Sequence, residues 1–290
     1  LLPAVLAQAT GTVGATLFQV PNQPLVFSDD KTRARRSEDS LVGYSWRRFL
    51  DAIKEGEPDP DAEMIVLLPM AKAAMAAMDA ITEFTAALAA GKIANAEGAV
   101  PAPVDKFLLC GASKRGWTTW TTGVVEKRCA AIVPVVMDLL DLQTNTDRTF
   151  EALGGWTFEY ADYIEAKMVG SVTHSAAMDA LARVSDPYAY FQADGPWRAV
   201  ENFMAIPKLV VDGANDEFFL PADDHLWWND LPGEKHLLFV PNADHGLRFP
   251  PFDGAGEAVF QAALEAFVGS VVRGTSRPTF SWRFDTSPAA

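Results

Sequence analysis

One serine in this sequence stands where a nucleophile could work. Ser113 lies within 107–117 (Phe-Leu-Leu-Cys-Gly-Ala-Ser-Lys-Arg-Gly-Trp), between an apolar run and an expected helix, with Gly111 and Gly116 on either side. A tight strand–turn–helix of this kind lifts the hydroxyl above the sheet edge, at a helix N-terminus that favours an oxyanion. The spacing G-x-S-x-x-G differs from the commoner G-x-S-x-G, so a plain glycine turn remains an alternative. The glycines are too sparse for a phosphate loop.

A serine hydroxyl needs a base, and the base needs an acid that fixes its tautomer. His245 directly follows the last expected strand, at the edge where open α/β sheets place chemistry. Asp216, in the loop after the preceding strand, is the preferred acid, while neighbouring Glu217 and the strand-end Asp138 are alternatives. The order Ser113, Asp216, His245 is that of the α/β-hydrolases. The sequence therefore predicts a serine–histidine–aspartate triad.

Two cations follow the serine directly. Lys114 and Arg115 occupy the first turn of the expected helix, where positive charge opposes the helix dipole by about 0.3–1 kcal/mol each. We expect an anionic partner, either a protein carboxylate or a group of the substrate. For Arg115 a structural ion pair is the favoured interpretation.

The elements expected around these residues alternate between strand and helix. Short apolar runs predict strands at 14–20, 105–110, 130–137, 208–212 and 236–241. Apolar stripes at helical spacing predict helices at 38–52, 71–90, 117–126 and 257–272. This alternation is typical of an α/β fold with a mostly parallel sheet flanked by helices.

A helical insert interrupts the alternation and could serve as a lid. It extends over about 141–200, with helices in 147–184 broken at 168–171. Its aromatic residues could line a pocket or form the core of the lid: Trp156, Phe158, Tyr160 and Tyr163.

Composition narrows the classes of function. With 24 Lys and Arg against 38 Asp and Glu, the formal charge is −14, which argues against a protein that binds a nucleic-acid backbone. No zinc motif appears, so we expect neither metal nor cofactor, and no apolar run is long enough for a membrane span. Cys110 and Cys129 fall at opposite ends of neighbouring strands, too far apart for a disulfide.

Four longer runs resemble the PhoPQ-activated pathogenicity-related family, which includes proteins similar to the autocrine proliferation repressor. They are 20–25, 111–117, 216–221 and 231–245. The resemblance implies an α/β-hydrolase-like fold and an extracytoplasmic location, and supplies no defined substrate. The run around Ser113, 111–116, which we call the elbow, is also similar to the Gly-Cys-Ser-Arg-x-Gly run of glucuronoyl esterases, where the cation helps hold the oxyanion. Lys114 stands at the matching position.

The resemblance also suggests an N-terminally truncated chain. Family members carry an earlier strand with a Gly-Gly turn before the segment equivalent to 1–9, and a second oxyanion donor is therefore expected before Leu1. Should the chain build the oxyanion hole alone, Asn22 and Gln23 are the first residues to consider. The expected division is an α/β-hydrolase-like domain at 1–273 and the start of a β-rich region at 274–290.

These patterns together predict a serine hydrolase that transfers the acyl group of an ester or amide. Its substrate would be a small molecule or a peptide or carbohydrate ester, with the backbone N–H of Lys114 as one oxyanion donor. The alternative is a secreted signalling or binding protein that keeps the fold with little or no turnover. The sequence does not predict an oligomeric state.

Overall fold

The strands form one parallel sheet. The computed structural model describes residues 2–54, 60–93, 100–170, 173–192, 201–248 and 255–282. In this part of the chain, neighbouring strands pair in parallel in the order β1-β2-β3-β4. Their bounds are Phe107–Ala112 (β1), Cys129–Val135 (β2), Lys208–Gly213 (β3) and Lys235–Val240 (β4). The predicted α/β class is confirmed, and four of the five predicted strands are present.

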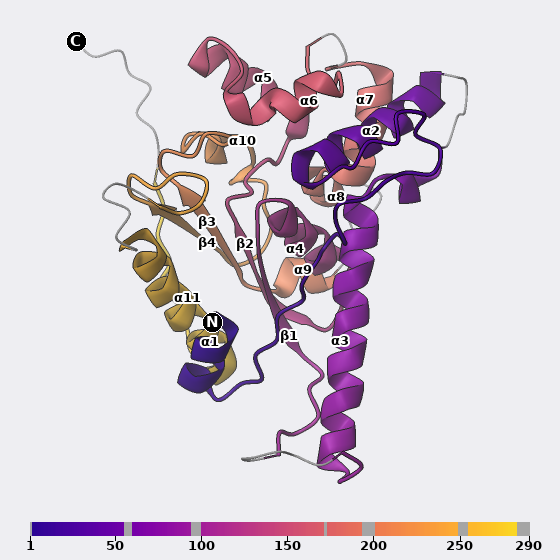
Figure 1. The fold of residues 1–290 in the computed structure, drawn as a ribbon. Helices are drawn as coiled ribbons and strands as arrows, with labels where there is room; N and C mark the ends of the chain where they lie inside the picture. The colour runs from indigo at the N-terminus through magenta and orange to yellow at the C-terminus, as the bar shows by residue number, and fades with distance from the viewer. Residues whose placement is uncertain are drawn as a thin grey trace, which may run out of the picture.

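Helices cover the sheet on both faces (Figure 1). The longer ones are α1 (Leu2–Thr10), α2 (Glu38–Lys54), α3 (Leu67–Ala89), α4 (Lys114–Val125), α5 (Leu142–Leu153), α7 (Ala176–Ser185) and α11 (Ala255–Arg273). The short ones are α6 (Ala161–Glu165), α8 (Pro187–Phe191), α9 (Glu201–Ala205), α10 (Asp224–Trp227) and the 3-10 turns η1 (Ala62–Met64) and η2 (Phe158–Tyr160). Helices α3 and α4 cover one face, α1 and α11 lie on the other, and α2 gathers with α5, α6 and α7 at one end of the sheet.

The apolar core is divided by the sheet. Successive residues of β2 point to opposite faces, so Ile132 belongs to the same apolar cluster as Trp120 of α4, whereas Val133 belongs to the cluster that contains Phe267 of α11. The strands are apolar throughout because both faces are covered, as parallel sheets require.

The N-terminal segment differs from the prediction. The expected strand at 14–20 is wrong: residues 12–19 are irregular and exposed, and Phe18 is 75% exposed. An apolar run becomes a strand only when a neighbouring strand accepts its hydrogen bonds, and none does so here among the described residues. Helix α1 was not predicted; Leu2 and Leu6 pack on the core beneath α11.

The helical insert is built from more pieces than predicted. Helices α5, α7 and α8 and the short η2–α6 turn follow β2, and the segment 193–200 lies outside the described residues, as do 171 and 172 of the expected break. Asp186 joins these pieces. One carboxylate oxygen accepts the N–H of Leu142 at 2.7 Å and the other accepts the N–H of Tyr188 at 2.9 Å.

Asp186 should make stability fall as pH rises. Burial, opposed by the two backbone N–H groups, raises its pKa from 3.8 to about 7. The folded state therefore holds this proton more tightly, and the stability it contributes is complete below about pH 3.8 and lost as pH rises through 7. We expect Asp186→Asn to make the melting temperature depend less on pH between pH 4 and 8. The exposed Asp179→Asn should keep the wild-type slope; identical slopes for all three chains would contradict this linkage.

The cysteines lie as the strand register requires. Cys129 pairs with Phe107 at the start of β1, whereas Cys110 pairs with Val133. No disulfide joins these two described residues. Burial raises the pKa of the Cys129 thiol to about 12.

The described chain ends without regular secondary structure. Residues 275–282 are irregular, and the rest of the expected β-rich region, 283–290, lies outside the described residues. Within the described part, no helix combines the length and the apolar character needed to cross a membrane.

Candidate active site

Ser113 occupies a strained turn between β1 and α4. Its φ of 55° and ψ of −125° lie in a region that residues other than glycine rarely adopt. Two backbone hydrogen bonds hold Ser113 in this conformation. Its N–H donates to the Val135 carbonyl at 2.9 Å, and its carbonyl accepts the Trp117 N–H at 3.0 Å. The hydroxyl therefore sits at the N-terminus of α4, where the first-turn N–H groups have no intrahelical partner.

The two flanking glycines are required by close approach. A Cβ on Gly111 would lie 2.4 Å from the Arg115 carbonyl oxygen, and one on Gly116 would lie 2.6 Å from the Cβ of Met137. The turn therefore leaves no space for a side chain at either position.

Replacing Gly111 with alanine should therefore destabilise the fold. The added methyl meets backbone rather than a flexible side chain, so overpacking should cost about 1–3 kcal/mol in the free energy of unfolding. Gly155→Ala is the matched control, since nothing lies within 4 Å of its Cβ position, and it should stay within about 1 kcal/mol of wild type. Urea denaturation followed by circular dichroism measures both; equal stabilities would contradict the crowding at the turn.

The structure brings the three predicted side chains together. His245 Nε2 lies 2.9 Å from Ser113 Oγ, and Nδ1 lies 2.8 Å from Asp216 Oδ2. The Asp216 side chain is fully buried and that of His245 is 18% exposed. The other carboxylate oxygen of Asp216 accepts the N–H groups of Phe218 and Phe219 at 2.8 and 3.2 Å, which fixes its orientation.

Three features around the histidine were not predicted. Gly213 ends β3, and a Cβ there would lie 2.6 Å from the carbonyl oxygens of both Ala243 and Asp244, so only glycine lets the two loops meet. Glu217, an alternative acid in the sequence, instead accepts the backbone N–H of His245 at 2.9 Å. The rings of Phe218 and Phe219 pack on the imidazole, with centroids 4.7 and 5.8 Å away. Of these three features, only the close approach at Gly213 left a signal in the sequence, which is a glycine at the end of a strand.

Asp138, the other alternative acid, lies outside this chain of hydrogen bonds. It is 1% exposed, and neither carboxylate oxygen has a partner among the described residues. Burial, together with the charge of Asp212, raises its pKa well above the usual range.

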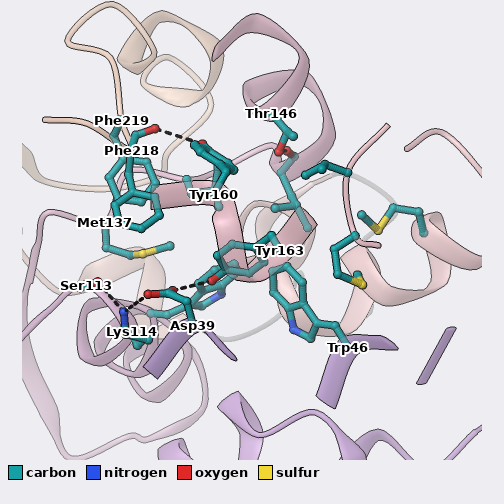
Figure 2. Close-up of a pocket in the computed structure, with 16 residues that line it drawn as sticks. Asp39, Trp46, Ser113, Lys114, Met137, Thr146, Tyr160, Tyr163, Phe218 and Phe219 are labelled. Carbon is teal, nitrogen blue, oxygen red and sulfur yellow. Dashed lines mark hydrogen bonds and ion pairs between the residues drawn. The ribbon is translucent and has the colours of Figure 1, made fainter. Parts of the chain in front are cut away.

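Carboxylates of α2 compensate the two cations of α4. Lys114 Nζ donates to Asp39 Oδ2 at 2.7 Å, lies 3.3 Å from Glu38 Oε2 and reaches Ser113 Oγ at 3.4 Å. Arg115 makes two hydrogen bonds to Glu38, at 2.6 and 2.9 Å. The expected anionic partner is thus a pair of protein carboxylates. Figure 2 shows Lys114 between Ser113 and Asp39.

This ion-pair cluster is anchored on two more sides. Tyr163 of α6 donates its hydroxyl to Asp39 Oδ1 at 2.8 Å. Gln23 accepts the Glu38 N–H at 2.9 Å and donates to the Glu38 carboxylate. The hydrogen bond from Arg115 is the main reason that the pKa of Glu38 is lowered to about 2. Gln23, expected near the oxyanion, thus holds α2 in place, while Asn22 is exposed.

A pocket opens beside Ser113. Of the four insert aromatics expected there, Tyr160 and Tyr163 line it, and Trp156 and Phe158 do not. Phe158 is 73% exposed. No group of three or more metal-ligating side chains converges in the described part of the chain.

The parallel sheet with helices on both faces, and the strained serine between its first strand and α4, make the fold α/β-hydrolase-like. Residues 2–289 match the PhoPQ-activated pathogenicity-related protein family. The chain belongs to this family, as its motifs predicted.

A curated relative and several solved structures are similar to the chain. It is 35% identical over 280 residues to the autocrine proliferation repressor protein A of Dictyostelium discoideum, covering 96% of this chain and 49% of that protein. The chain thus spans about half the length of the curated relative. A puromycin-hydrolysing peptidase of Mycobacterium tuberculosis is 18% identical, with a TM-score of 0.41 over 67% of this chain and 24% of its own. The acetyl xylan esterase 1 of a Thermoanaerobacterium species is 14% identical, with a TM-score of 0.39 over 74% of this chain and 56% of its own.

Proposed function

We propose that the protein is a serine hydrolase that cleaves esters or amides through Ser113, His245 and Asp216. The observation that carries the proposal is the unbroken chain of hydrogen bonds from Ser113 Oγ through both ring nitrogens of His245 to Asp216. A buried carboxylate on Nδ1 fixes the tautomer that leaves Nε2 free to accept the serine proton. The strained backbone of Ser113 supports the same role, because strain of this kind gathers at functional sites.

The proposed reaction has two stages, which are acylation of Ser113 and hydrolysis of the acyl-enzyme. Ser113 Oγ bonds to the acyl carbon as its proton passes to His245 Nε2, and the carbonyl oxygen becomes an oxyanion. The C–O or C–N bond then breaks, and the leaving group takes the proton from His245. Water attacks the acyl-enzyme with His245 as base, which releases the carboxylic acid and restores the serine hydroxyl.

Lys114 would stabilise the oxyanion in two ways. Its backbone N–H lies at the N-terminus of α4, and its ammonium group lies 3.4 Å from Ser113 Oγ. We expect Lys114→Met to lower kcat about 10–100-fold with little change in KM. Arg115→Met is the matched control: it also loses an ion pair to Glu38, but the guanidinium of Arg115 bonds Glu38 rather than Ser113, and its variant should keep kcat within about threefold. Equal losses in the two variants would assign Lys114 to structure alone.

Labelling with a fluorophosphonate probe tests the proposal. The wild-type chain and the exposed-serine control Ser28→Ala should label equally, and Ser113→Ala should not label. Should the wild-type chain remain unlabelled while folded, the proposal fails. The rival is then favoured: a signalling or binding protein without turnover, a possibility raised by the name of the Dictyostelium relative.

A further inference from the structure

The pocket beside Ser113 is an apolar cavity beneath the helical insert. Its empty space, counted together with the part that is open to solvent, is about 570 Å³. Figure 2 shows Ser113 and Lys114 at one side of it and Trp46 at the other, with Tyr163 between them. Much of the lining is buried and aliphatic or thioether in character, from Met137, Leu142, Met168 and Met178. Flexible methionine side chains adapt to apolar ligands of varied shape.

The polar groups on the lining are largely committed to one another. The Lys114 ammonium is neutralised by Asp39 and Glu38, and Tyr163 donates to Asp39. Tyr160 donates its hydroxyl to the Phe218 carbonyl at 3.1 Å. The exception among described residues is the buried indole N–H of Trp46, which has no acceptor and could bind a neutral oxygen atom. The lining therefore offers no uncommitted cation to a carboxylate on the substrate.

Further carboxylates lie near the catalytic histidine and on the pocket lining. Glu217 lies at the histidine loop, bonded to the His245 N–H, and half-buried Glu159 is close enough to it that their charges interact. Burial, followed by the charge of Glu217, raises the pKa of Glu159. Glu217 and Glu159 do not line the pocket, but Asp39 does, and a substrate carboxylate in the pocket would meet its like charge, which costs free energy in a partly desolvated site.

The position of the histidine decides which half of an ester enters the pocket. Ser113 lines the pocket, and His245 is not among the residues that line it. Because His245 must hand its proton to the leaving alcohol, the alcohol lies on the side of His245. The acyl half then extends the other way, from Ser113 into the apolar cavity.

We propose that the enzyme acts on esters of uncharged, apolar carboxylic acids, and that the cavity beneath the helical insert binds the acyl chain. This rests on the proposed function, since it requires Ser113 to form the acyl-enzyme. Each methylene transferred from water to an apolar site improves binding about fourfold, so longer chains gain until the cavity is full.

Hydrolysis of p-nitrophenyl esters by the wild-type chain tests this. From acetate through butyrate to hexanoate, kcat/KM should rise at least about tenfold. The mono-p-nitrophenyl ester of adipic acid has the length of the hexanoate but ends in a carboxylate, and it should be hydrolysed at least about 100-fold less efficiently. A flat series, or an adipate ester cleaved as well as the hexanoate, overturns the acyl site.

Two variants test whether the preference for longer acyl chains arises in this cavity. Val169 lines the pocket and is partly exposed, so Val169→Trp should fill space that the chain needs and bring the hexanoate-to-acetate ratio towards one. Val272 lies half-exposed on α11, away from the pocket, and Val272→Trp should keep the wild-type ratio. A wild-type ratio in a folded Val169→Trp variant contradicts the assignment, and the substrate series stands independently of either variant.

The two proposals fail in different ways. Fluorophosphonate labelling at Ser113 with no chain-length preference refutes the acyl site and leaves the hydrolase intact. Absence of both labelling and ester hydrolysis refutes the proposed function, and the acyl site with it.

Discussion

Replacing His245 with glutamine should lower kcat for ester hydrolysis by about 10⁵–10⁶-fold. In the wild-type chain, His245 Nε2 lies 2.9 Å from Ser113 Oγ and can take its proton. Glutamine preserves much of the volume of the histidine side chain, but it cannot accept this proton. Loss of the base in a serine triad removes nearly all of the catalysis that the triad supplies. Steady-state kinetics with a soluble p-nitrophenyl ester measure the effect, and near-wild-type melting would show that the variant is folded.

His236→Gln is the matched control for the base. His236 also bonds a carboxylate through a ring nitrogen, to Glu234 at 2.8 Å, but it lies on β4. We expect its kcat to stay within about threefold of wild type. A His245→Gln variant that retained a tenth of the wild-type kcat would show that His245 is not the base.

Asp216→Asn should lower kcat by about 10⁴-fold while the fold persists. The asparagine oxygen can still accept the Phe218 N–H, so the loop geometry survives. Its amide group, however, would donate towards Nδ1 and stabilise the wrong tautomer of His245. The loss should appear in kcat far more than in KM.

Asp138→Asn distinguishes Asp216 from Asp138, one of the two alternative acids that the sequence left open. Asp138 is buried, its oxygens lack partners among the described residues and burial raises its pKa, so an amide at this position breaks no hydrogen bond to His245. We expect kcat within about threefold of wild type. A 10⁴-fold loss in Asp138→Asn, with Asp216→Asn nearly unaffected, would move the acid to the end of β2.

The parts of the fold predictable from sequence are those with local causes. The elbow around Ser113 could be predicted from an apolar run, two glycines and the start of a helix. Helix α4 begins at the residue after Ser113, three residues before its predicted start. Residues Asp216 and His245 could be paired because parallel strands end at one edge of the sheet. Which of Asp216, Glu217 and Asp138 faces the imidazole depended on loop conformation, which residue type alone does not fix.

The features missed depend on contacts between distant segments. Asp39 lies 75 residues before Lys114, and no pattern in either helix names the other as its partner. The apolar run at 14–20 satisfies strand propensity but has no hydrogen-bonded neighbour in the described chain, so it stays irregular. Conversely α1 is short and gains its stability from packing on α11, which its own sequence does not show.

Trapping the acyl-enzyme tests the central claim most directly. The wild-type chain would be mixed with p-nitrophenyl hexanoate, quenched in acid during turnover and analysed by intact-mass and peptide mass spectrometry. We predict one hexanoyl group per chain, located on Ser113, together with a burst of nitrophenol of the same stoichiometry; Ser113→Ala should show neither. Hydrolysis that continues in a folded Ser113→Ala variant, or an acyl group found on another residue, would contradict the account.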